Sequence, residues 1–248
     1  MVEQTETLAT EDGPMGVHIV RPDGDGPFPV VVYFHHGPGL DAGSKQSMGW
    51  IAEAGYYVIS HDRYHREEPW FHLTDRNDEG AMQRFWGVLM GTTDAMVATD
   101  LAAVLAHVDG DPAAREAPMG CIGFCIGARS VLRTITADPD RFPVGVGMHP
   151  SFTVTDDDDS PHRAVPAYTG SIYLGYGADD TMQSPESQQA LIDMVEAMGD
   201  RGRVEIHDGA NHGYTVPGPA YYAPAADPSY ERALALFDQE LRGPASSV

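Results

Sequence analysis

Apolar, β-branched runs alternate with helical segments along most of the chain, and this order constrains the fold more than any other feature. The first run, 29–35, is continuously apolar, which is typical of a strand covered on both faces. Further strands are expected at 55–60, 119–124, 144–148, 171–176 and 203–207. Strands that alternate with helices predict an α/β fold with a mostly parallel central sheet flanked by helices.

The helical segments between the runs predict the rest of the architecture. They are expected near 44–54, 126–137, 184–198 and 228–241, together with a longer segment over 81–107 that Gly87 and Gly91 interrupt. The polar segment 66–80 predicts a loop or lid. Because no repeat and no linker-like composition divides the chain, we expect one domain over residues 1–248, with 1–15 as an extended or loosely ordered N-terminal arm.

Acidic residues strongly outnumber basic ones, with 37 Asp and Glu against 15 Lys and Arg and a net charge of −22. Binding to nucleic acid requires a basic face, and an anionic membrane surface repels an acidic protein, so we expect neither partner. The N-terminus lacks the basic and apolar regions of a signal peptide, and no apolar run approaches the ~20 residues of a membrane span. We therefore expect a cytoplasmic protein, either monomer or dimer.

The stretch Gly123-Phe-Cys-Ile-Gly127 has the G-x-S-x-G pattern with Cys125 in the serine position, between a predicted strand and a predicted helix. Tiny residues two places before and after Cys125 let the strand and the helix approach through a sharp turn. The positive end of the following helix favours a thiolate at this position. Cys125 is therefore a candidate nucleophile, whereas Cys121 inside the strand is expected in the core.

A cysteine nucleophile needs an imidazole to take its proton and an acid to orient that imidazole. In this fold class they follow the nucleophile in the order acid, base. Asp179 and Asp180 come just after the predicted strand 171–176, and His212 follows the last predicted strand. Cys125, His212 and one of the two aspartates therefore satisfy the order.

With these motifs the sequence resembles the dienelactone hydrolase family of the α/β-hydrolase superfamily, from about Gly16 to Leu241. The segments that carry the resemblance are Val30–Phe34 and its turn, Gly55–Val58 with Asp62, Gly123–Gly127, Gly177–Asp180 and Ala210–Gly213. The resemblance implies an α/β-hydrolase fold. It also selects Asp180 over Asp179, because the family's acid follows a glycine by three positions.

The resemblance further implies a hydrolase that cleaves a small lactone or carboxylic ester without a cofactor. Cys125 would attack the carbonyl carbon, and His212, held by Asp180, would carry the proton. The backbone N–H of Ile126 and one from the His36–Gly37 turn would form the oxyanion hole.

Two positions depart from the family pattern. His36 stands where dienelactone hydrolases have a glutamate beside the resting cysteine, and Val216 stands where an arginine holds the substrate carboxylate. Two alternatives therefore stay open, namely non-hydrolytic acyl or C–C bond chemistry at the same site, and a degenerate homologue that binds a ligand without turnover.

Several aromatic, histidine and arginine side chains near the motifs are candidates for contact with the substrate: His36, Tyr64, Arg84, Trp86, Arg129, His149 and Tyr214, with Arg63 and Arg66 as further arginines. For each arginine the alternative is a surface or salt-bridge role. The histidines at 35, 36, 61 and 65 invite a metal site. Because no cysteine or carboxylate of recognised spacing accompanies them, we expect no metal.

Overall fold

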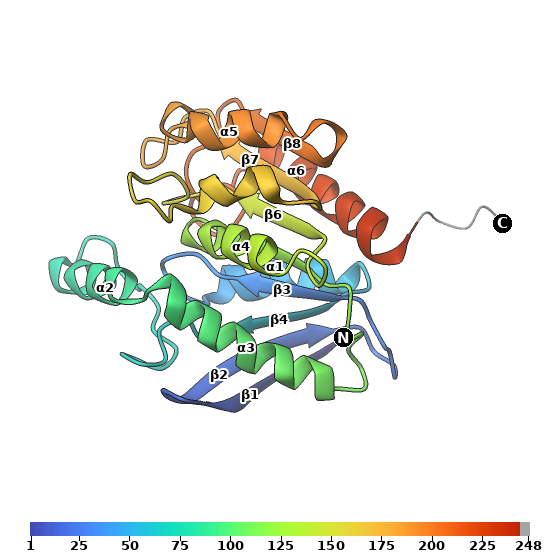
Figure 1. The fold of residues 1–248 in the computed structure, drawn as a ribbon. Coiled ribbons are helices and arrows are strands. Elements are labelled where there is room, and N and C mark those ends of the chain that lie inside the picture. The colour runs from blue at the N-terminus through green and yellow to red at the C-terminus, as the bar shows by residue number, and fades with distance from the viewer. Residues whose placement is uncertain (244–248) are drawn as a thin grey trace. The chain divides into compact units, whose positions relative to one another are not determined.

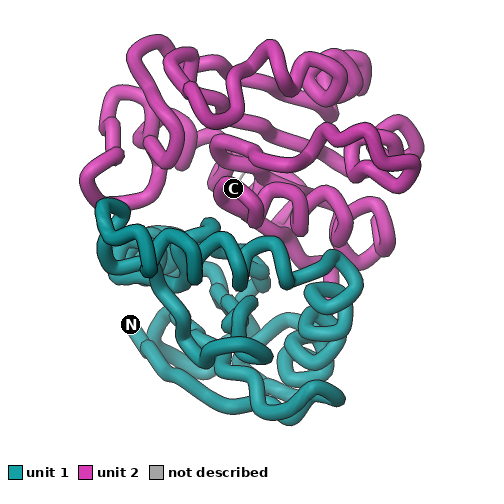
Figure 2. Tube along the Cα trace, turned by 90° about the vertical axis from the view of Figure 1, so that its left-hand side faces the viewer, with its two compact units in different colours: residues 1–116 teal, residues 117–248 magenta. Residues whose placement is uncertain are grey.

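The computed structural model describes residues 1–243, and the chain divides into two compact units, residues 1–116 and 117–248 (Figures 1 and 2). The first unit has an open sheet in the order β1-β2-β4-β3. Its strands are β1 (Val2–Thr10), β2 (Gly13–Arg21), β3 (Val30–Phe34) and β4 (Tyr57–His61), and its helices are α1 (Ala42–Glu53), α2 (Glu79–Gly91) and α3 (Asp94–Gly110). The organisation of the whole chain as one domain stays a prediction.

The strands β3 and β4 are buried along their whole length, as the apolar runs predict, and they pair in parallel. The expected N-terminal arm is extended and takes part in the sheet. β1 pairs antiparallel with β2 over its full length, and β2 pairs antiparallel with β4. β1 exposes most of its side chains, so its sequence carries little of the apolar signal of a strand.

The predicted long helix over 81–107 is two helices, α2 and α3, bent by 76° relative to each other. The hydroxyl of Thr92 donates to the carbonyl oxygen of Val88 at 2.9 Å, and Thr93 caps α3 by accepting the N–H of Met96 at 3.3 Å. The break therefore falls at two threonines directly after Gly91. Within residues 1–243 no single helix is long and apolar enough to cross a membrane; only this bent pair, taken together, reaches that length and composition.

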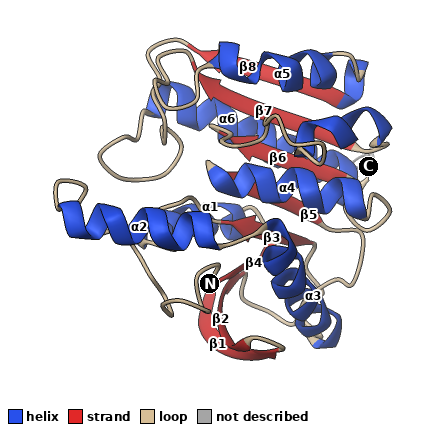
Figure 3. Ribbon diagram, turned by 60° about the vertical axis from the view of Figure 1, so that its left-hand side comes forward, coloured by secondary structure: helices blue, strands red, loops and turns tan. Residues whose placement is uncertain are grey.

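The second unit has four parallel strands that are neighbours in chain order. They are β5 (Gly120–Phe124), β6 (Val144–Met148), β7 (Ser171–Gly177) and β8 (Gly202–His207), with helices α4 (Ile126–Ala137), α5 (Gln189–Glu196) and α6 (Ala223–Phe237). Short helical turns span Pro161–Ala167, Pro185–Gln188, Gly199–Arg201 and Asp238–Arg242. In Figure 3, α4 lies along β5 and β6.

The register of these strands decides where the functional side chains lie. Phe124 pairs with Met148, Met148 with Gly175, and Gly177 with His207. The carboxyl ends of all four strands therefore meet at one edge of the second unit's sheet. In open α/β sheets this edge is where ligands bind, and the loops after β5, β6, β7 and β8 all begin here.

Candidate active site

Cys125 occupies a sharp turn between β5 and α4, with φ 55° and ψ −119°. A left-handed φ is uncommon for a residue with a β-carbon and persists where the surroundings enforce it. The Cys125 N–H donates to the carbonyl oxygen of Met148 at 3.0 Å. A β-carbon on Gly123 would lie 2.2 Å from the carbonyl oxygen of Gly127, so only glycine fits there. The turn has the strained strand-to-helix geometry that the motif predicts.

His212 and Asp180 form a short hydrogen bond, with 2.7 Å between Nδ1 and Oδ2. The other carboxylate oxygen of Asp180 accepts the N–H groups of Met182 and Gln183, each at 2.9 Å. Asp180 is only 3% exposed, whereas its neighbour Asp179 is exposed. Asp180 therefore has the imidazole partner and the ordered surroundings of an orienting acid.

The surroundings of His212 favour its protonated form. Burial opposes protonation, but hydrogen bonding to Asp180 and Cys125 and the charges of both outweigh it and raise the pKa of His212 to about 10. Nε2 of His212, the ring nitrogen that does not bind Asp180, is buried. An imidazole next to a thiol in such surroundings can hold the thiol proton and leave a thiolate.

His149 and Tyr214, two of the candidates for substrate contact, are almost fully buried. The His149 ring meets the His212 ring edge to face, with centroids 4.9 Å apart, and it also packs against Tyr214 at 5.9 Å. The Tyr214 hydroxyl lies 3.0 Å from that of Ser229. His149 therefore packs directly against the His212 ring, Tyr214 packs against His149, and both side chains expose little surface of their own.

Arg129 points to the backbone of the loop after β6. Its Nη1 donates to the carbonyl oxygen of Phe152 at 2.6 Å. The same loop carries Ser151, whose Oγ lies 3.4 Å from Sγ of Cys125. Sequence reasoning missed Ser151, because it belongs to no motif. The only signal was its place three residues after the predicted strand 144–148.

The turn after β3 contains His36 and Gly37, the candidates for the second oxyanion donor. Nε2 of His36 lies 3.1 Å from Oδ2 of Asp41, the residue that caps α1. The Tyr64 hydroxyl donates to the carbonyl oxygen of Gly37 at 2.7 Å. Tyr64 is buried and packs edge to face against His35, so its contacts fix the shape of this turn.

The two candidates on α2 differ from the others because both are exposed. Arg84 is 63% exposed and forms an ion pair with Glu68, and Trp86 is 41% exposed. A cavity of about 300 Å³ lies against this helix. It is lined by Glu68, Trp70, Phe71, His72, Leu73, Thr74, Ala81 and Arg84.

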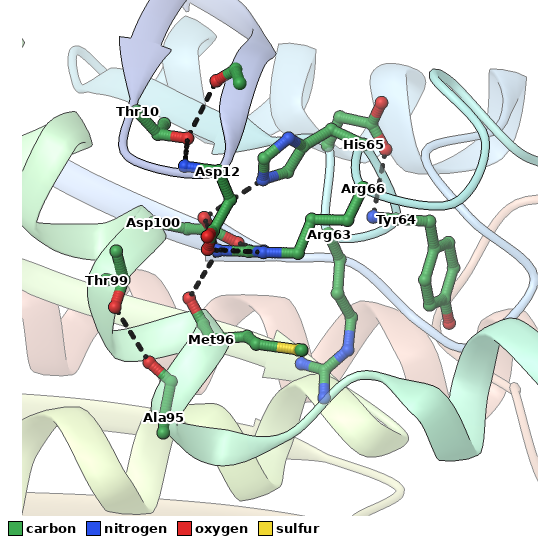
Figure 4. Close-up of polar contacts among 12 residues, drawn as sticks. Thr10, Asp12, Arg63, Tyr64, His65, Arg66, Ala95, Met96, Thr99 and Asp100 are labelled. Carbon is green, nitrogen blue, oxygen red and sulfur yellow. Dashed lines mark hydrogen bonds and ion pairs between the residues drawn. The ribbon is translucent and has the colours of Figure 1, made fainter.

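Arg66 forms ion pairs with Asp12 and the buried Asp100 within the first unit (Figure 4). Its two terminal nitrogens bind the two oxygens of Asp100, each at 2.8 Å, and Nε donates to Asp12 at 2.8 Å. Nε2 of His65 lies 3.1 Å from Oδ1 of Asp100. Arg66 therefore acts as a salt-bridge arginine, which was the alternative to a contact with the substrate. In residues 1–243, no three His, Cys, Asp or Glu side chains are grouped as metal ligands.

Comparison with known proteins gives the same fold over nearly the whole chain. Residues 15–241 match the model of the dienelactone hydrolase family. The "Putative carboxymethylenebutenolidase" of Synechocystis sp. is 23% identical, over 95% of this chain and 96% of that protein. The carboxymethylenebutenolidase of Pseudomonas putida is 22% identical, over 94% of this chain and 95% of that protein.

A solved structure, the "Putative Dienelactone Hydrolase" of Klebsiella pneumoniae, superposes with a TM-score of 0.80. It is 19% identical, and the match covers 96% of this chain and 100% of that one. The α/β-hydrolase fold expected from the sequence, with mostly parallel strands flanked by helices, is thereby confirmed.

Proposed function

Because the chain belongs to the dienelactone hydrolase family, and is thus a hydrolase of ester bonds, we propose that it cleaves a small lactone or carboxylic ester with Cys125 as nucleophile. The observation that carries the proposal is the hydrogen bond between Asp180 and His212 beside the Cys125 turn. It provides the acid-oriented imidazole that a cysteine nucleophile requires.

In the proposed reaction, His212 takes the thiol proton and the Cys125 thiolate attacks the carbonyl carbon. The tetrahedral intermediate collapses to a thioester as the C–O bond of the ester breaks, and His212 returns the proton to the departing alkoxide. Water then attacks the thioester, His212 accepts a proton from it, and Cys125 leaves as the product acid forms. Asp180 holds the imidazole in the tautomer that this proton transfer needs.

The negative charge on the carbonyl oxygen needs backbone donors. Ile126 is the first residue of α4, where N–H groups have no partner within the helix, so its N–H is the proposed first donor. Loss of one such donor typically costs about 2.7–4 kcal/mol of transition-state stabilisation. The second donor, assigned by the resemblance to the His36–Gly37 turn, stays a prediction.

The net charge of the chain indicates which partners and which substrates to expect. A net charge of −22 supports a protein that binds neither nucleic acid nor an anionic membrane surface. It also disfavours the approach of an anionic substrate. A neutral lactone or ester is therefore the substrate class to test first.

The test compares wild type, Cys125→Ala and Cys121→Ala on a panel of aryl esters, neutral lactones and dienelactones. Cys121 is the matched control because it is a buried core thiol, as predicted, and burial raises its pKa. We expect Cys125→Ala to lose turnover while it keeps its melting temperature, and Cys121→Ala to stay active. Retained activity in Cys125→Ala would refute the mechanism.

Product analysis in H₂¹⁸O separates the remaining alternatives. Hydrolysis must place one solvent oxygen in the acid product. A product without the label would indicate acyl transfer or C–C bond chemistry at the same site. Binding of panel members without any product would indicate a homologue that has lost turnover.

A further inference from the structure

Ser151 lies in the loop after β6, at the edge of the sheet where the strands end. It is only 1% exposed. His149 and Phe152, on either side of it, have φ of 38° and 55°, so the backbone turns sharply before and after the serine. Left-handed backbone is unfavourable for residues with a β-carbon and persists where the surrounding structure over-determines it. The loop therefore has a defined shape that keeps Ser151 inside.

Both the backbone and the side chain of Ser151 meet Cys125. The Ser151 N–H donates to the carbonyl oxygen of Cys125 at 3.1 Å. The Ser151 hydroxyl oxygen lies 3.4 Å from the Cys125 sulfur, a normal distance for a hydrogen bond to sulfur. The backbone hydrogen bond holds the loop after β6 against the Cys125 turn. The Ser151 hydroxyl therefore lies within hydrogen-bond distance of the Cys125 sulfur.

Two side chains from other segments, Arg129 and Gln183, bind the backbone of this loop. The sequence indicated Arg129 as a candidate for substrate contact and did not single out Gln183. The Phe152 carbonyl oxygen accepts Nη1 of Arg129, from α4. The Phe152 N–H donates to Oε1 of Gln183 at 3.3 Å, and the backbone N–H of Gln183 donates to Asp180. The loop is thus connected both to the helix that follows Cys125 and to the acid that orients His212.

We propose that Ser151 is a positioning residue whose hydroxyl donates a hydrogen bond to the Cys125 thiolate and fixes the place of the sulfur. The inference rests on the proposed function, in which this sulfur is the nucleophile. A thiolate accepts hydrogen bonds more strongly than a thiol, because bonds to a charged group are about twice as strong as neutral ones. The hydroxyl therefore stabilises the reactive form and stops the sulfur from turning away.

The titratable and charged side chains around this sulfur in the second unit come from every loop at the edge. His212 and its partner Asp180 come from the loops after β8 and β7, and His149 from the loop that holds Ser151. Arg129 lies on α4 and binds the Phe152 backbone. Ser151 itself does not titrate, so its removal changes the hydrogen bonding of the sulfur and leaves these charges in place.

The test measures the rate at which iodoacetamide alkylates Cys125 between pH 4 and pH 10, read by mass spectrometry of the intact protein. The variants are Ser151→Ala and the isosteric pair Ser151→Thr and Ser151→Val, which differ by the hydroxyl. Ser171→Ala is the matched control, since Ser171 is a buried serine of the same unit whose hydroxyl donates to Glu240. Melting by circular dichroism verifies that each variant is folded.

We expect Ser151→Ala and Ser151→Val to shift the acid limb of the alkylation profile upward by about one pH unit. The Thr variant should follow wild type, and Ser171→Ala should not shift. An unchanged profile in both hydroxyl-free variants overturns the proposal. A Thr profile that follows Val overturns it too, because packing would then be the cause. If Ser151→Ala does not fold, the Thr and Val pair decides.

The alkylation readout needs no turnover, so it separates this inference from the proposed function. Full esterase activity in Cys125→Ala would refute the proposed function, and Ser151 would then have no part in catalysis. A shifted profile would still establish the contact between the hydroxyl and the thiolate. Lost activity in Cys125→Ala with an unshifted Ser151→Val profile would refute the serine's role alone.

Discussion

Replacement of Asp180 by asparagine tests the geometry of the site most directly. One oxygen of Asp180 accepts two backbone N–H groups, from Met182 and Gln183, and the other accepts from Nδ1 of His212. An asparagine has one oxygen, and the two backbone donors determine which way it faces. The amide NH₂ then points at Nδ1, which must become an acceptor, so the ring proton moves to Nε2.

An imidazole protonated at Nε2 cannot take the proton of Cys125. A carboxylate-to-amide change that imposes the wrong tautomer costs about 10⁴-fold in kcat in a serine-protease triad. We expect a loss of about 10³–10⁴-fold for Asp180→Asn, which corresponds to about 4–5.5 kcal/mol of transition-state stabilisation. KM should change little, because Asp180 is buried and its carboxylate is bonded to His212 and to two backbone N–H groups.

The assay is steady-state hydrolysis of a chromogenic aryl ester at several pH values, with Asp179→Asn as the matched control. Asp179 is the adjacent aspartate, and it is exposed. The control should keep wild-type kcat. Activity of Asp180→Asn within tenfold of wild type, or an equal loss in Asp179→Asn, would refute the assignment of the acid.

Three further predictions concern stability. Burial opposes protonation of His212, but its hydrogen bonds raise its pKa from 6.5 to about 10. The protonated imidazole therefore contributes its full stabilisation below pH 6.5, and this contribution is lost as the pH rises through 10. In urea denaturation, the stability deficit of His212→Gln should therefore shrink from pH 6.5 to pH 10; a constant deficit would contradict this. Gly123→Ala should lower the free energy of unfolding by about 1–3 kcal/mol, because its β-carbon meets the Gly127 carbonyl oxygen at 2.2 Å, and an unchanged melting temperature would count against that steric argument. Asp100→Asn should cost about 3–5 kcal/mol by breaking the buried pair with Arg66, and a loss below 1 kcal/mol in denaturant titration would mean that the network contributes little.

The elements that the sequence predicted best are those in which the local pattern and the tertiary structure require the same thing. The helix over 126–137 and the strand over 144–148 match α4 and β6. Around Cys125 the glycines are required by backbone contact, so the motif encodes the turn directly. The same holds for the continuous apolar runs, because a strand buried on both faces needs no polar positions.

Elements whose formation depends on distant residues were predicted poorly. β1 pairs along its whole length with β2, yet its polar residues give no alternation that would distinguish a strand from an arm. The last predicted helix, 228–241, was expected to start at Pro228, but α6 begins at Ala223. Pro224 takes the first turn of α6, where a missing N–H costs nothing, and Pro228 lies inside the helix.

The same distinction between local pattern and tertiary structure applies to the residues of the candidate site. Cys125 and His212 could be selected because nucleophile, acid and base follow a set order in this fold class, and the resemblance to the family selected Asp180 over Asp179. The structure gives Asp180 and His212 a direct hydrogen bond. Ser151 could not be selected, because its contact with Cys125 depends on how the loop after β6 folds back on the turn. Arg66 could be named as a salt-bridge arginine, but its partner Asp100, 34 residues away in the chain, could not be identified from the sequence.

The boundary between residues 116 and 117 has a consequence for how such a protein can diversify. Cys125, Asp180 and His212 are all encoded after it, whereas His36 and Arg84 are encoded before it. Recombination at this point would exchange the first half of the gene for that of a relative, including the His36–Gly37 turn, and keep Cys125, Asp180 and His212 together. Chimaeras joined there would therefore vary one half of the chain while the three residues proposed for proton transfer stay encoded together.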